Sequence, residues 1–254
     1  MKTNFFKKHK LLTALLLVLI FFIGYATYYL TSYLPASDLA VASLVSTQTV
    51  TVTNTQSSIT FAPAKTSTKV GLIYYPGGKV DPASFAYAAS EIAKEDIFVV
   101  IVKMPFNLAI FDTNKANAVM DQYPDIDEWY LAGFSLGGTA ASMYAHEHPD
   151  KIDGLILYAS YTTKESSLKE ADFPVLSISG SNDGLATPQD ILDKSIYLPP
   201  TTDFVKIEGA NHTQMALYNN AKPQSGDNKA DITDNQQQRD LIDATIKFIK
   251  TYSK

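Results

Sequence analysis

The sequence lacks cysteine entirely, and its 254 residues include only four histidines. The absence of cysteine excludes disulfide bonds, a thiolate nucleophile, iron–sulfur clusters and cysteine-bound zinc. Four histidines leave little room for a histidine-rich metal site. We therefore expect neither a metal nor a cofactor.

Arginine is also scarce, since Arg239 is the only one. The net charge is −5, and the chain is more acidic still beyond the four lysines that precede the first apolar run. Bidentate phosphate contacts need arginine and a phosphate backbone attracts basic surfaces, so we expect no nucleic-acid partner. Hydrophobic residues make up 46% of the chain, which excludes a disordered protein and supplies one domain with a substantial core.

An uncharged segment follows the basic N-terminus and covers residues 11–37. Its first part, Leu11–Leu30, is almost wholly apolar. A helix of about twenty residues spans the roughly 30 Å hydrocarbon core of a bilayer. Because basic flanks stay in the cytoplasm, we expect a cytoplasmic segment over residues 1–10, a cell-membrane anchor over 11–34 and an extracellular domain.

A cleaved signal peptide is the alternative for this segment. Ala40-Val41-Ala42 offers small residues for cleavage. However, the apolar run exceeds the length of about 7–15 residues typical of a signal peptide, and the cleavage site lies about ten residues beyond it. We favour a retained, single-pass anchor.

The rest of the chain has the pattern of an α/β domain over residues 46–254, preceded by a short linker over 35–45. Thr47–Thr53 and Ser58–Ala62 predict an antiparallel hairpin around Asn54. Runs that are apolar on both faces then predict parallel strands covered by helices on each side. These runs are Val70–Tyr75, Ile97–Val102, Trp129–Ala132, Leu155–Ala159, Val175–Ser179 and Phe204–Ile207.

Helix starts between these runs are marked by capping residues. Asp81-Pro82 predicts a helix over Pro82–Lys94, and Thr187-Pro188 opens another before Ile191–Ser195. Thr233 and Gln236 have the spacing of a capping box for the last helix. The longest polar stretch is Tyr218–Asp234, and a loop of that length in a compact domain is usually functional or disordered.

Ser135 is the candidate nucleophile. It lies in Gly133-Phe-Ser-Leu-Gly137, directly after an apolar strand and before a helix of small residues. This context is typical of a nucleophile elbow, where a strained turn projects the hydroxyl at a helix N-terminus that favours a developing anion. The alternative is a glycine-rich turn that only packs a helix onto a strand.

His212 is the candidate base for this serine, largely by elimination. His9 is cytoplasmic in the expected topology, and His146 and His148 lie ten or more helical residues beyond Ser135, about 15 Å or more away. His212 follows the last predicted strand, and α/β sheets place their sites at the carboxyl ends of strands.

Asp183 is the candidate acid that orients the histidine. It lies in the turn after the strand that precedes His212, in Ser179-Gly-Ser-Asn-Asp183. The alternatives are an ordinary turn aspartate before glycine, and Asp203 near another strand end.

The turn Tyr75-Pro-Gly-Gly-Lys79 after the first parallel strand supplies a candidate oxyanion hole. We expect backbone N–H groups of Gly78 and Leu136 to face the substrate oxygen, with Gly77 giving flexibility and Lys79 adding charge nearby. The alternatives are a glycine turn that only closes a strand and an exposed lysine.

Together these motifs resemble the α/β-hydrolase family over about residues 69–254, and most resemble its small serine-hydrolase branch near dienelactone hydrolases. The resemblance implies an α/β-hydrolase fold, with a mostly parallel sheet, helices on both faces and the order Ser135, Asp183, His212 as triad. It also places the Lys103–Leu108 segment beside the pocket, so we expect Phe106 and Phe134, with Gly77 and Lys79, to border the substrate. Membrane-anchored members of this type resemble proteins of Gram-positive bacteria.

The sequence departs from the family in two ways. Dienelactone hydrolases use cysteine as nucleophile, so their lactone specificity does not carry over. Only Ser160–Phe173 is available for the helical lid that many members insert, which favours small or exposed acyl groups over lipase substrates.

We therefore expect a membrane-anchored, extracellular bacterial serine hydrolase that acts on an ester or related acyl bond of a small molecule or cell-wall polymer. Transfer of the acyl group to a hydroxyl acceptor is one alternative, and a non-catalytic binding module that retains the fold is another. The oligomeric state is left open.

Overall fold

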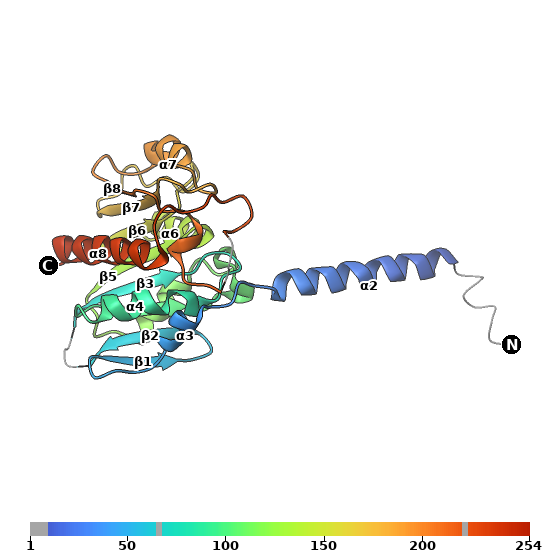
Figure 1. The fold of residues 1–254 in the computed structure, drawn as a ribbon, viewed down its shortest axis with the longest axis horizontal. Helices are drawn as coiled ribbons and strands as arrows, with labels where there is room; N and C mark the ends of the chain where they lie inside the picture. Colours follow the sequence, from blue (N-terminus) through green and yellow to red (C-terminus); the bar gives the residue numbers. More distant parts are fainter. Residues whose placement is uncertain (1–9, 65–67, 220–222) are drawn as a thin grey trace. The chain divides into compact units, whose positions relative to one another are not determined.

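Helix α2 (Lys10–Thr31) opens the described part of the chain in a computed structural model that covers residues 10–64, 68–219 and 223–254 (Figure 1). The chain divides into two units, Met1–Tyr33 and Leu34–Lys254. Within α2, the segment Leu12–Thr31 is long and apolar enough to cross a membrane, and none of its side chains is buried. A membrane anchor and a signal sequence both fit this helix. The cytoplasmic segment and His9 lie outside the described residues, apart from Lys10.

One eight-stranded sheet forms the frame of the second unit, in the order β1-β2-β4-β3-β5-β6-β7-β8. β1 pairs antiparallel with β2 and β2 with β4, whereas the strands from β4 to β8 are parallel. This confirms the predicted hairpin and the mostly parallel sheet. The strands are β1 (Val50–Asn54), β2 (Ser58–Pro63), β3 (Val70–Tyr75), β4 (Phe98–Val102), β5 (Glu128–Phe134), β6 (Gly154–Tyr158), β7 (Val175–Gly180) and β8 (Asp203–Ile207).

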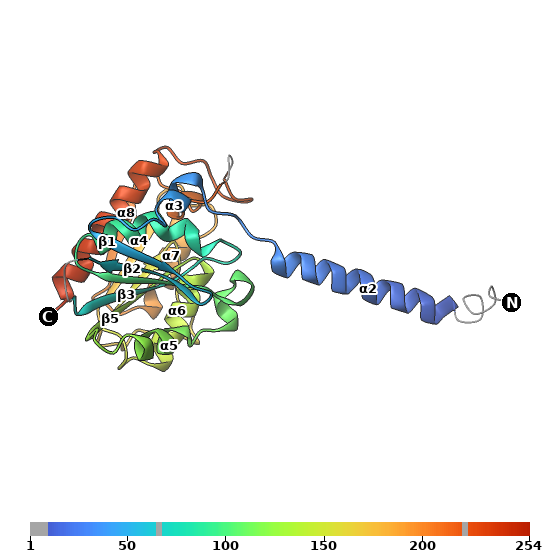
Figure 2. The same ribbon diagram turned by 90° about the horizontal axis from the view of Figure 1, so that it is seen from below.

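The sheet separates two cores, because successive side chains of a strand point to opposite faces. In β3, Leu72 and Tyr74 join one core and Ile73 and Tyr75 the other. Figure 2 shows α3, α4 and α8 on one side of the sheet and α5 and α6 on the other. The helices are α3 (Asp38–Ala42), α4 (Ala86–Ala93), α5 (Lys115–Gln122), α6 (Leu136–Glu147), α7 (Pro188–Lys194) and α8 (Asp234–Tyr252).

The predicted helix starts are present, with two differences. Thr187 and Asp190 form a complete capping box, each side chain bonding the other's backbone N–H. Thr233 accepts from the Gln236 N–H, but the Gln236 amide bonds Asp240 instead of returning to Thr233. The segment after Asp81 begins as a short 3-10 helix, η1 (Pro82–Phe85), before α4.

Residues 35–45, expected to be a linker, fold as part of the second unit. Ser37 caps α3, and Ala40 is fully buried. Leu34, Ala36 and Leu44 pack against the core beside α4 and α8. The apolar positions in this short segment are the reason that it docks onto the domain.

The parallel strands all end at one edge of the sheet, which we call the carboxyl edge. Strand order reverses between β3 and β5, and α/β sheets bind ligands outside such a switch point. Ser160–Phe173, all of it described, contains no helix or strand and therefore no helical lid.

Candidate active site

Ser135 lies in the sharp turn between β5 and α6. Its φ of 51° and ψ of −122° are strained for a residue with a side chain. The flanking glycines permit the turn: a Cβ on Gly133 would meet the Gly137 backbone, and one on Gly137 would overlap the Tyr75 carbonyl of β3. Ser160 Oγ also donates to the Ser135 carbonyl oxygen at 2.7 Å. The packing of β3, β5 and α6 thus holds the hydroxyl at the carboxyl edge.

His212 and Asp183 meet although 29 residues separate them. Nδ1 of His212 lies 2.8 Å from Oδ2 of Asp183, and both side chains are almost fully buried. The His212 ring also packs on Phe134, with centroids 4.8 Å apart. Burial strengthens a hydrogen bond between these groups, so the imidazole is fixed in orientation.

A pocket of about 270 Å³ brings Ser135 and His212 together. Within the described chain, the Ser135 hydroxyl makes no hydrogen bond to His212. Such contacts are often long before substrate binds. The remaining walls come from the first turn of α6, from the turns after β6 and β7 and from the polar stretch: Leu136, Thr139, Ala159, Ser160, Tyr161, Leu185, Ala186 and Gln224.

The Asp183 carboxylate is held by its own turn as well as by the histidine. Oδ1 accepts from the N–H groups of Leu185 at 2.8 Å and Ala186 at 2.7 Å. Asp203, the other candidate acid, begins β8 at the opposite edge and accepts from the Tyr252 hydroxyl. Of the two, only Asp183 reaches His212.

Asp227 is a residue of the site that sequence reasoning missed. Its Oδ1 accepts from the N–H of Gly184 at 3.0 Å and of His212 at 3.4 Å. Its Oδ2 accepts from the N–H and hydroxyl of Thr213 at 2.8 and 2.5 Å. One carboxylate thus joins the Asp183 turn to the His212 turn. The only signal was its position in the polar stretch Tyr218–Asp234.

The expected oxyanion residues lie next to each other. A Cβ built on Gly78 would lie 3.0 Å from the Leu136 side chain. Leu136 is the first residue of α6, and the first N–H groups of a helix have no partner within it. The Lys79 backbone N–H donates to the Asn107 carbonyl at 2.8 Å, which ties this turn to the loop after β4.

The residues expected to border the substrate differ in their burial and in their distance along the chain from the Ser135 turn. Phe134 is 1% exposed and lies beneath the His212 ring. Gly77 packs against Phe134, and Lys79 has a positive φ of 62°. Phe106 is 52% exposed on the loop after β4. Of the predicted residues, Ser135, Leu136 and His212 line the 270 Å³ pocket.

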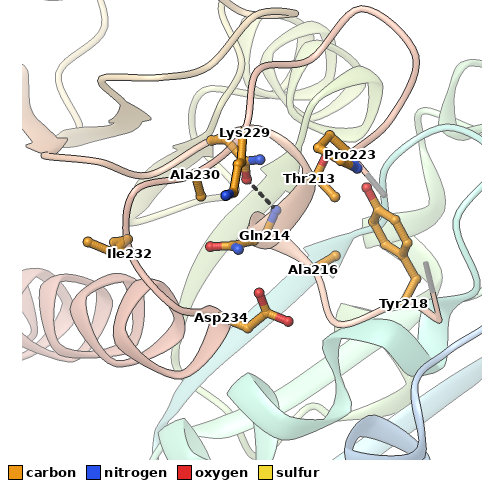
Figure 3. Close-up of a pocket in the computed structure, with 10 residues that line it drawn as sticks. Thr213, Gln214, Ala216, Tyr218, Pro223, Lys229, Ala230, Ile232 and Asp234 are labelled. Carbon is orange, nitrogen blue, oxygen red and sulfur yellow. Dashed lines mark hydrogen bonds between the residues drawn. The ribbon is translucent and has the colours of Figure 1, made fainter. Parts of the chain in front are cut away.

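A larger pocket of about 530 Å³ lies beside the His212 turn (Figure 3). Gln214, Tyr218, Lys229 and Asp234 are among its walls. Burial raises the pKa of Tyr218 to about 12, and its hydroxyl accepts from Gln224 Nε2 at 2.7 Å. Gln224 also lines the Ser135 pocket, so the polar stretch forms walls of both.

The remaining described histidines lie apart from this pocket. His146 bonds the Ser167 carbonyl, and His148 bonds Asn114 at the far end of α6. In the described ranges, no group of three or more His, Asp or Glu residues is arranged to hold a metal ion.

Comparison with known proteins finds one matching family model and many solved structures that are similar to this chain. The model of the "Alpha/beta hydrolase family" matches residues 71–239. Est1E from Butyrivibrio proteoclasticus, solved with ferulic acid bound, is 14% identical, with a TM-score of 0.59 over 80% of this chain and 96% of that chain. The esterase Est2 from Thermogutta terrifontis is 15% identical, with a TM-score of 0.55 over 80% and 93%. Comparison with curated protein sequences gave no match.

Proposed function

Because the chain belongs to the alpha/beta hydrolase family, we propose that it is a serine ester hydrolase with Ser135, His212 and Asp183 as its triad. The observation that carries this proposal is the buried hydrogen bond between His212 and Asp183, at the edge of the pocket that Ser135 lines. The nucleophile, the orienting acid and the base occur in that order along the chain, which is the order of this family.

In the proposed reaction, Ser135 Oγ attacks the ester carbonyl while His212 Nε2 takes the hydroxyl proton. The N–H groups of Leu136 and Gly78 stabilise the oxyanion. His212 then gives its proton to the departing alcohol, leaving an acyl-serine. Water attacks this acyl group with the same histidine as base, and the acid leaves as Ser135 regains its proton.

The substrate class follows from the size of the pocket. A cavity of about 270 Å³ lies just below the usual range of about 300–1,000 Å³ for small-molecule sites, and the described segment Ser160–Phe173 forms no helical lid. A short acyl group on a small molecule or a cell-wall polymer fits these dimensions.

We further propose that α2 is retained as a membrane anchor with the hydrolase domain outside the cell. Cleavage after Ala42 would remove α3 and the fully buried Ala40. Residues that belong to the folded domain are poor candidates for a discarded leader. N-terminal sequencing of the mature protein tests this point, and a start near Ser43 would contradict it.

The first experiment is labelling of the full-length protein with a fluorophosphonate, followed by mapping of the adduct. We expect the adduct on Ser135, and its loss in His212→Ala. Ser135→Ala should abolish hydrolysis of a small ester, whereas Ser142→Ala, buried in helix α6 that follows Ser135, provides the matched control. A folded protein that takes no label would instead favour a non-catalytic module.

A further inference from the structure

The first residue of the second unit is bonded to the oxyanion turn. Leu34 forms a parallel bridge with Val80. Its N–H donates to the Lys79 carbonyl at 2.7 Å, and its carbonyl accepts from the Asp81 N–H at 2.9 Å. The chain therefore enters this unit at the carboxyl edge, beside the turn that carries Gly78.

The next residues are bonded to the loop after His212. Ser37 N–H donates to the Leu217 carbonyl at 2.9 Å, and Asn219 N–H donates to the Pro35 carbonyl at 2.7 Å. Residues 34–37 thus join two loops that flank the proposed active site. The entry point cannot move away from this edge without breaking backbone hydrogen bonds.

Exposed apolar side chains gather on the loop after β4 at the same edge. Phe106, Ile110 and Phe111 are 52, 44 and 58% exposed, and the two phenyl rings pack edge to face with centroids 6.0 Å apart. We call these three residues the apolar patch. The Asn107 carbonyl accepts from the Lys79 N–H, so the patch borders the turn that holds Leu34.

The short connection between α2 and Leu34 points to the membrane as the partner of this patch. α2 ends at Thr31, three Cα steps before Leu34, which is at most about 11 Å of extended chain. Tyr28, Tyr29 and Tyr33 lie at this point, and tyrosine favours the headgroup region of a bilayer. If α2 spans the membrane, this short connection limits how far Leu34 can lie from the lipid headgroups.

We propose that the carboxyl edge, through the apolar patch, rests on the membrane surface. The pocket then binds ester groups of amphiphilic molecules that are retained in the membrane. The substrate class is a short acyl group on a membrane-retained molecule, because the pocket is small and opens at this edge. This inference rests on the proposed hydrolase function and on the anchor.

The absence of native cysteine permits a direct test of the geometry. A Phe111→Cys chain is labelled with an environment-sensitive fluorophore and reconstituted, at full length, in vesicles with nitroxide-bearing lipids. Phe204→Cys is the matched control, since Phe204 is 52% exposed at the opposite edge in β8. We expect at least twofold stronger lipid quenching at position 111. Equal quenching, or cross-linking between copies through position 111, would overturn the proposal.

Activity gives a second, separable readout. Ile110→Ser with Phe111→Ser should lower kcat/KM at least fivefold for a short acyl ester on a long alkyl chain in vesicles, and less than twofold for soluble p-nitrophenyl butyrate. Leu192→Ser with Ile196→Ser, 62 and 63% exposed on α7 and the following turn, is the control and should change neither. Equal losses on both esters would contradict membrane presentation.

The two proposals fail in different ways. If position 111 is quenched by lipid but the unaltered chain hydrolyses neither ester, the docking surface stands and the hydrolase function fails. If both esters are hydrolysed but position 111 is not quenched, the function stands and the docking surface fails.

Discussion

Asp183 and Asp227 both accept hydrogen bonds beside His212, but they bond different parts of it. Asp183 meets the ring at Nδ1, whereas Asp227 meets the backbone N–H. In the proposed reaction the ring gains and loses charge, and the backbone does not. Asp183 therefore acts on the proton transfer, while Asp227 acts on the positions of the groups that perform it.

The surroundings of the two carboxylates differ as well. Asp183 is 2% exposed, so water cannot replace it beside an imidazolium. Asp227 is partly exposed and divides its hydrogen bonds between two turns. A charge in a buried site interacts more strongly than one near solvent. We therefore expect the loss of charge at Asp183 to affect mainly catalysis, and the loss of charge at Asp227 to affect mainly the structure of the two turns.

The largest effect is expected for Asp183→Asn. The amide can still accept from Leu185 and Ala186, but it carries no charge to stabilise the imidazolium. In serine-protease triads the equivalent change lowers kcat by about 10⁴-fold. By the same analogy we expect kcat on a soluble ester to fall by about 10³-fold or more. Thermal unfolding should change little, and Asp203→Asn, the rejected candidate, should retain activity.

A smaller loss of activity with a larger loss of stability is expected for Asp227→Asn. The substitution weakens charge-assisted hydrogen bonds to two turns, each worth about 1.5–3 kcal/mol. We expect the free energy of unfolding to fall by about 2 kcal/mol and kcat/KM by about tenfold. Chemical denaturation and ester kinetics measure the two quantities.

Asp231→Asn is the matched control for that variant. Asp231 lies in the same stretch, is exposed and accepts from the Asn182 side chain rather than from the backbone. It should cost less than Asp227→Asn in both measurements. A loss of activity at Asp227 as large as at Asp183, with unchanged stability, would break the distinction between the two carboxylates.

Gly184→Ala probes the contact between the same two regions. A Cβ on Gly184 would lie 2.6 Å from the Gly226 carbonyl oxygen and 3.0 Å from the Asn228 nitrogen. Because both neighbours are backbone atoms, the turns must separate, at a cost of about 1–3 kcal/mol. The double variant with Asp227→Asn should lose less stability than the sum of the two single losses, since both substitutions break the same contact. Full additivity would show that the turns are independent.

The contrast between the two aspartates also explains how far the sequence predicts the site. Asp183 and His212 follow apolar strands, and the carboxyl ends of parallel strands meet at one edge, so their approach is predictable. Asp227 follows no strand, and nothing local specifies that it folds back onto Gly184. Its place depends on tertiary contacts of a polar stretch.

The same limit applies to the fold. β3 was predicted with the bounds Val70–Tyr75 that the structure shows, because its apolar run is unbroken. Helix α5 was not predicted, since Lys115–Gln122 buries only Ala116 and Val119 and has no capping side chain. Segment 35–45 was expected to be a linker, yet it folds as part of the second unit because the adjoining core supplies a partner for its apolar residues.

The smallest effect is expected at Tyr218, which begins the polar stretch. Tyr218→Phe removes one hydrogen bond to Gln224, worth about 0.5–1.5 kcal/mol at neutral pH. Because burial raises the pKa of Tyr218 to about 12, the folded state keeps its proton while the unfolded state loses it above its ordinary value near 10. That contribution to stability is complete below pH 10 and is lost as the pH rises toward 12.

Urea unfolding between pH 9 and about 12 measures this contribution, and the stability of Tyr218→Phe should fall less steeply with pH than that of the unaltered chain. Tyr144→Phe is the control, because burial also raises the pKa of Tyr144 to about 12, away from the pocket. Both variants should flatten the alkaline slope, but only Tyr218→Phe should raise KM, since Tyr218 holds Gln224 in the pocket wall. An unchanged KM in Tyr218→Phe would mean that Gln224 is positioned by its backbone bonds to Thr213 and Asp227.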